Sequence, residues 1–166
     1  MLTCLLALRR AVYFIRFIVT FTGCELGKVM TSKITKGIYK LVEEANQVVE
    51  EISVETAQSL LGQEGIQFID IRDIRELQRD GVIPGAYHCP RGMLEFWVDP
   101  ESPYAKSIFQ KDLTFVLFCA GGLRSALAGR AITEMGLEGV KHVHGGFGAW
   151  RKAGGVIEEY QAKAKA

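Results

Sequence analysis

Apolar residues recur with a helical period through residues 38–52. The apolar positions of this segment are Ile38, Leu41, Val42, Ala45, Val48, Val49 and Ile52. Their spacing of three or four residues predicts a helix with one buried stripe, and glutamates such as Glu43 and Glu50 fall on its other side. A second short helix is predicted after Ser53, because serine favours the N-cap position, and Gly62 is expected to end it.

Farther along the chain, short apolar runs alternate with amphipathic segments. The predicted strands are residues 67–72, 86–89, 115–118 and 140–143, and the uniformly apolar run 115–118 is typical of a strand buried on both faces. Helices are predicted within the charged run 73–79, over residues 125–135 and near Trp150, whereas Pro100 and Pro103 predict an irregular segment over 92–110. Strands that alternate with helices predict an α/β domain with a mainly parallel sheet.

Residues 1–29 differ from the rest of the chain because they carry four basic residues and only one acidic residue. Arg9, Arg10 and Arg16 interrupt their apolar runs, whereas a membrane-spanning helix needs about 20 apolar residues in succession, so stable membrane insertion is not expected. A signal peptide would place its positive charges before the apolar stretch. The remaining interpretations are an organelle-targeting peptide, a helix on a membrane surface, and an extension upstream of a start at Met30.

Net charge and cysteine spacing argue against a nucleic-acid-binding protein, a zinc protein and a disulfide-stabilised protein. The net charge of the 166 residues is +1, and residues 30–166 hold 16 basic and 18 acidic residues, so nucleic-acid binding is not expected. The cysteines are Cys4, Cys24, Cys89 and Cys119, and no two of them form a CxxC pair. Neither a zinc site nor a disulfide framework is expected. Reduced thiols predict a cytoplasmic location, with an organelle or a membrane surface as the alternatives that residues 1–29 raise.

The stretch Cys119-Ala120-Gly121-Gly122-Leu123-Arg124-Ser125 lies where a predicted buried strand turns into a helix. Ligands bind at the carboxyl ends of strands in open α/β sheets, and a glycine pair lets backbone N–H groups converge on an anion. Ser125 is predicted to cap the helix, whose dipole would stabilise a thiolate at Cys119. Arg124 adds a positive charge suited to an oxyanion. These residues predict covalent catalysis by Cys119 on an anionic substrate; the alternative is an ordinary buried cysteine beside a glycine turn.

Three motifs in this order resemble those of the rhodanese family. Residues 119–125 are similar to its Cys-x-x-Gly-x-Arg-Ser active loop. Residues 69–86, with Asp70, Arg72, Glu76 and the run Gly-Val-Ile-Pro-Gly-Ala, resemble its Asp-x-Arg … Glu … Gly-His-Ile-Pro-Gly-Ala element. Residues 145–150 resemble its closing Gly-Gly-x-x-x-Trp. The resemblance covers roughly residues 50–156, with Val82 where the family commonly has histidine.

The resemblance implies a rhodanese-like fold, with about five mostly parallel strands flanked by helices, over residues 52–158. It places an N-terminal helix within 30–51 and a tail at 159–166. It also implies a thiosulfate sulfurtransferase that works by ping-pong transfer, in which Cys119 takes a sulfur atom from a small anionic donor such as thiosulfate. The resulting persulfide is passed to cyanide or a thiol, and no cofactor or metal is implied.

The resemblance assigns roles to further residues of the motifs. Arg124 would orient the donor, and Asp70 and Arg72 would brace the loop, although a purely structural salt bridge explains that pair equally well. The residues that would hold the persulfide's charge are Ala120, Gly121, Gly122, Leu123 and Ser125.

Other functions and roles stay open at this point. Phosphatases and arsenate reductases on this fold have a Cys-x5-Arg loop, whereas this chain has Cys-x4-Arg, from Cys119 to Arg124. A non-catalytic interaction module, or a sulfur carrier that serves a protein thiol, is a second alternative. Cys89 is a resolving thiol or, as we expect, a packed core thiol. His144 is a candidate to face the pocket.

Overall fold

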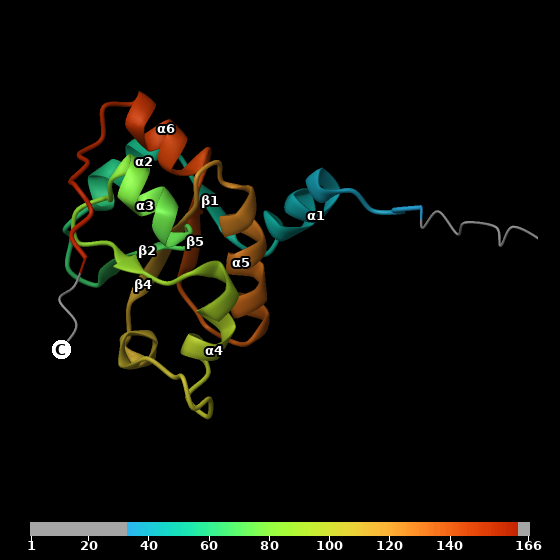
Figure 1. The fold of residues 1–166 in the computed structure, drawn as a ribbon. Helices are drawn as coiled ribbons and strands as arrows, with labels where there is room; N and C mark the ends of the chain where they lie inside the picture. The colour runs from blue at the N-terminus through green and yellow to red at the C-terminus, as the bar shows by residue number, and fades with distance from the viewer. Residues whose placement is uncertain (1–32, 163–166) are drawn as a thin grey trace, which may run out of the picture. The chain divides into compact units, whose positions relative to one another are not determined.

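The computed structural model describes residues 33–162, so the predictions for residues 1–29 lie outside the described residues. The strands are β1 (Glu50–Ile52), β2 (Ile66–Asp70), β3 (Tyr87–His88), β4 (Thr114–Phe118) and β5 (Val140–Val143). They form one sheet in the order β1-β5-β4-β2-β3, and every neighbouring pair is parallel. The predicted α/β class with a parallel sheet is therefore confirmed (Figure 1).

Helices cover both faces of the sheet (Figure 1). The helices are α1 (Ile38–Ala45), α2 (Val54–Leu60), α3 (Ile74–Asp80), α4 (Leu94–Val98), α5 (Leu123–Glu134) and α6 (Gly146–Lys152), with short 3-10 helices η1 (Arg91–Met93) and η2 (Ser107–Gln110). Alternate residues of β4 serve the two faces, since side chains of a strand point to opposite sides. Leu117 packs in the core beneath α4 and α5, whereas Val116 and Phe118 pack with Phe147 and Trp150 beneath α2 and α6.

The predicted helix over residues 38–52 was wrong in its second half. Helix α1 ends at Ala45, and Glu50–Ile52 form the edge strand β1, which pairs with Lys141–Val143 of β5. Of the apolar positions in this second half, Val48 is exposed, whereas Val49 and Ile52 are buried in different layers. Val49 lies in the core beside α5, whereas Ile52 faces the opposite layer. Residues 50–52 form a strand because β5 supplies their hydrogen-bond partners. Those partners lie far away in the sequence, so the local apolar pattern could not reveal them.

The segment 92–110, predicted to be irregular, contains α4 and η2. Helix α4 is five residues long and ends before Pro100, so the two prolines limit its length without preventing it. Leu94 and Val98 of α4 are buried, and the helix packs against α5. Within residues 33–162, no helix has the length and apolar character to cross a membrane.

Candidate active site

Cys119 directly follows β4, the middle strand of the sheet. Its residue surface is 1% exposed, and its side chain belongs to the core cluster beneath α5. The neighbouring strand β2 ends at the same edge, where the N–H of Ile71 donates to the carbonyl of Phe118 at 3.1 Å. The predicted strand-to-helix corner is thus present, and its cysteine lies at the carboxyl end of the sheet.

The loop after Cys119 turns its carbonyl groups away from the sulfur. The N–H of Phe147 donates to the carbonyl of Cys119 at 2.8 Å, and the N–H of Gly148 donates to that of Ala120 at 2.9 Å. Both donors belong to the first turn of α6. The first turn of α6 therefore holds the start of the loop in place.

Gly122 closes the loop in a left-handed conformation, with φ of 89°, and its N–H donates to the Cys119 Sγ at 3.2 Å. Within residues 33–162, no hydrogen bond uses the backbone N–H of residues 120, 121, 123, 124 or 125 as donor. Several amides of this loop therefore remain available as donors, and successive free amides of this kind are typical of anion sites.

Ser125 was wrongly predicted to cap the helix after Cys119. Helix α5 begins at Leu123 with Gly122 as its N-cap, because the tight curl of the loop starts the helix earlier. The buried Ser125 hydroxyl donates to the carbonyl of Gly122 at 2.9 Å and lies 3.8 Å from the Cys119 Sγ. Ser125 therefore lies beneath the loop and supports its curvature.

Arg124 forms a bidentate ion pair with Glu76. Its Nη1 and Nη2 atoms donate to the two carboxylate oxygens of Glu76, each at 2.8 Å. Arg124 holds the pKa of Glu76 at about 2, well below its ordinary value. Glu76 raises the pKa of Arg124, and the neighbouring Cys119 sulfur raises it further. The guanidinium belongs to the same loop as the reactive sulfur, but its charge already has a partner.

The sequence motif contains Glu76 but does not reveal its pairing with Arg124. The two residues lie 48 positions apart. Glu76 is also the N3 residue of a capping box with Asp73 at the start of α3. That capping box was the local signal that fixes where Glu76 lies.

Asp70 and Arg72 form a buried ion pair beside the active loop. The Arg72 Nη2 atom lies 2.6 Å from Asp70 Oδ2 and 2.8 Å from the carbonyl of Gly81, and both charged side chains are buried. The Arg72 guanidinium carbon lies 3.8 Å from the centre of the Phe147 ring. Since Phe147 holds the carbonyl of Cys119, the pair contacts the loop through α6 and not directly.

The remaining candidate residues make contacts of their own, and Cys89 shares the core cluster of Cys119. Cys89 is buried, and burial raises its pKa to about 12. His144 is 73% exposed, and its Nδ1 atom lies 3.0 Å from a carboxylate oxygen of Glu51. Trp97 packs edge-on against Tyr87. Across residues 33–162, no three His, Cys, Asp or Glu side chains gather as metal ligands.

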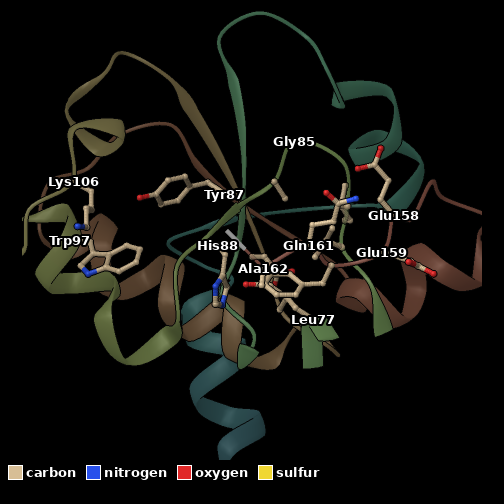
Figure 2. A pocket seen from close by; sticks show the side chains of 15 residues that line it. Leu77, Gly85, Tyr87, His88, Trp97, Lys106, Glu158, Glu159, Gln161 and Ala162 are labelled. Atoms are coloured by element: carbon tan, nitrogen blue, oxygen red, sulfur yellow. The ribbon is translucent and has the colours of Figure 1, made fainter. Parts of the chain in front are cut away.

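A cavity of about 960 Å³ lies along the edge strand β3 and does not include Cys119. Figure 2 shows Trp97 and Lys106 on one side of it and Glu158 and Glu159 on the other. His88 lines this cavity, and its Nε2 atom lies 2.9 Å from the carbonyl oxygen of Arg72, which follows β2.

Comparison with known proteins adds a family match. Residues 53–153 match the model of the rhodanese-like domain. The thiosulfate sulfurtransferase GlpE of Vibrio cholerae is 31% identical over 108 residues, which cover 64% of this chain and 92% of GlpE. An uncharacterized protein of Synechocystis is 31% identical over 103 residues, which cover 62% of this chain but only about half (52%) of that protein.

A solved structure from Rhodopseudomonas palustris is similar over most of the domain. That protein is 55% identical, and the match covers 78% of this chain and 99% of the other, with a TM-score of 0.75. It is a protein of unknown function described as a "Possible Tyrosine Phosphatase". The relatives thus include both a sulfurtransferase and a protein for which phosphatase activity has been suggested.

Proposed function

Because this chain belongs to the family of rhodanese-like domains, we propose that it is a sulfurtransferase in which Cys119 carries sulfur as a persulfide. The donor is thiosulfate or a similar small sulfur donor, and the acceptor is cyanide or a thiol, including a thiol of a partner protein. GlpE, which is named a thiosulfate sulfurtransferase, supports this reaction class.

The observation that carries the proposal is the run of backbone amides that follows Cys119, one of which donates to its Sγ. The N–H of Gly122 already donates to the sulfur at 3.2 Å, and its neighbours have no other acceptor within residues 33–162. Fixed donors aimed at a negative charge stabilise it without reorganisation. The loop is therefore suited to hold sulfur as an anion, first as a thiolate and then as a persulfide.

The transfer is a displacement at sulfur and involves no net oxidation. The Cys119 thiolate attacks the outer sulfur of thiosulfate, a new S–S bond forms, and sulfite leaves with the electron pair of the broken S–S bond. The outer sulfur of the persulfide then carries the negative charge within the loop. A thiolate or cyanide ion attacks that outer sulfur in the second step, and Cys119 leaves as a thiolate.

Phosphatase activity is the second candidate, because it is suggested for the Rhodopseudomonas palustris protein. Two features favour sulfur transfer. The loop from Cys119 to Arg124 has four intervening residues, whereas the phosphatases on this fold have five. In addition, both oxygens of Glu76 accept from the terminal nitrogens of Arg124, so a phosphate would compete with this carboxylate for the guanidinium.

Intact-mass spectrometry of the full chain tests the proposal. Treatment with excess thiosulfate should add one sulfur, about 32 Da, which cyanide removes and which Cys119→Ser never gains. Cys89→Ser is the matched control and should still load. A sulfur that persists in Cys119→Ser would reject the assignment. Hydrolysis of an aryl phosphate, measured in parallel, should not exceed the rate of Cys119→Ser; hydrolysis that requires Cys119 would favour the phosphatase.

A further inference from the structure

We propose that Glu76 determines the donor class of this site, favouring donors with one negative charge or none, such as the persulfides of thiols, over the dianion thiosulfate. The inference rests on the proposed function, since it concerns which donor loads Cys119. The ion pair between Glu76 and Arg124 sets the charge of the active loop, and the sequence motif alone does not reveal this pair.

Glu76 compensates the guanidinium of Arg124, the only arginine of the loop that carries the reactive sulfur. Both of its oxygens accept from the terminal nitrogens of Arg124 at 2.8 Å. With its pKa held at about 2, Glu76 is ionised at neutral pH. A guanidinium has five N–H donors, so Arg124 can still donate hydrogen bonds, but the pair as a whole has no net charge.

The other guanidinium groups that follow the neighbouring strands are also paired. Arg72, after β2, is bound by Asp70, and Arg91, after β3, is bound by Glu95 at 2.6 and 2.8 Å. Residues 30–166 contain 16 basic and 18 acidic residues, so the body of the protein adds no general attraction for anions. The attraction for a donor therefore comes mainly from the short-range amides of the loop.

Charge repulsion discriminates between donors because the Coulomb energy is proportional to the charge of each partner. Glu76 should oppose a dianion about twice as strongly, in free energy, as a monoanion at the same place. A thiol persulfide, RSS⁻, delivers its outer sulfur with atoms and charge in balance. Cys119 attacks the outer sulfur, the S–S bond of the donor breaks, and RS⁻ leaves with the electron pair.

Glu76→Gln removes the negative charge of the side chain but keeps its role at the start of α3. Glutamine keeps the side-chain oxygen that accepts from the N–H of Asp73, and it serves equally well in a capping box. Glu134→Gln is the matched control. Glu134 also pairs with an arginine, Arg130, but at the far end of α5.

The measurement is the second-order rate constant for loading Cys119 in the full chain, with thiosulfate and with 2-hydroxyethyl persulfide as donors. Glu76→Gln should raise the constant for thiosulfate about tenfold and that for the persulfide about threefold, because the logarithm of the change follows the donor charge. Glu134→Gln should change neither constant. Equal changes for the two donors, or a fall with thiosulfate, would overturn the proposal and leave Glu76 as a support for Arg124.

A measurement on the unmodified protein guards against misfolding of the variant. Raising the KCl concentration screens repulsion between like charges, so the constant for thiosulfate should rise relative to that for the persulfide. A fall in this ratio contradicts the inference. If neither donor loads Cys119 in the unmodified protein, the proposed function itself has failed, and that outcome is distinct from a wrong donor preference.

Discussion

The backbone N–H of Phe147 donates to the carbonyl of Cys119 at 2.8 Å, so the first turn of α6 fixes the orientation of the reactive residue's own peptide group. This contact is possible because Gly146 has no side chain. A Cβ atom at Gly146 would lie 2.3 Å from the carbonyl oxygen of Cys119, and its φ of +55° is one that other residues rarely adopt.

Gly146→Ala should therefore abolish most of the loading activity. The added methyl group must push the Cys119 peptide away and turn the loop amides out of position, so we expect a loss of at least about a hundredfold, as when one oxyanion donor is removed. Persulfide formation measured by mass or by thiocyanate release tests this. Gly154→Ala is the control, because Gly154 has a similar φ of +71° but no atom near the added Cβ. Equal losses in the two variants would mean that backbone strain alone is responsible.

Arg124→Ala should impair loading from thiosulfate far more than it impairs folding. The side chain is 43% exposed, so its ion pair should contribute no more than about 1 kcal/mol to the free energy of unfolding. Its removal leaves the carboxylate of Glu76 uncompensated beside the sulfur, and we expect thiosulfate loading to fall about a hundredfold. Urea unfolding and donor kinetics on the same preparation check both parts. Arg130→Ala removes a partly exposed arginine from the same helix and should leave the rate of thiosulfate loading unchanged. A large fall in the free energy of unfolding of Arg124→Ala would instead show that Arg124 has a structural role.

Cys89 should take no part in sulfur transfer. Burial raises its pKa to about 12, so almost none of it is thiolate at neutral pH, and the thiolate is the reactive form. Iodoacetamide at pH 7.5 should modify Cys119 long before Cys89, as peptide mapping would reveal. Cys89→Ala should lower the free energy of unfolding by about 1 kcal/mol, through the small cavity it leaves, and retain full activity. Loss of transfer in that folded variant would show that Cys89 is a resolving thiol after all.

His142 should make the fold less stable in mild acid. It lies on β5 with Nε2 at 3.0 Å from Asn46 Oδ1, and its Nδ1 atom is buried without a partner among the described residues. Burial lowers the pKa of His142 below its ordinary value of 6.5, and this effect outweighs the opposite influence of Glu51, while His144 lowers the pKa further. The folded state then binds the proton less readily than the unfolded chain. Stability is complete above about pH 6.5 and declines as the pH falls from there toward the folded-state pKa.

Urea unfolding at pH 7.5 and pH 5.5 measures this contribution. The fall in the free energy of unfolding between these two values should be smaller in His142→Gln, which cannot titrate, than in the unmodified protein. His144→Gln is the control, since His144 is mostly exposed. An unchanged pH dependence in His142→Gln would assign the acid sensitivity to other groups.

Local sequence pattern and tertiary structure disagree at β1. The spacing of Ala45, Val48, Val49 and Ile52 fits a helix, yet this segment turns after Ala45 and ends as a strand. Strand β1 exists because β5 offers it a hydrogen-bonding edge, with Ile52 opposite Val143. By contrast, α2 begins after the predicted cap Ser53, whose side chain accepts from the N–H of Thr56, because that signal lies within one turn of helix.

The sequence by itself determined the α/β class, the strand at 140–143 and the location of Cys119 between a buried strand and a helix. Apolar periodicity, caps and glycines act over a few residues, and these features depend on little else. Only the tertiary structure decided that Gly122 and not Ser125 caps α5, that α6 holds the loop carbonyls, and that Glu76 compensates Arg124. Each of these depends on chain curvature or on partners far away in sequence, and such contacts exist only once the sheet has brought its strand ends together.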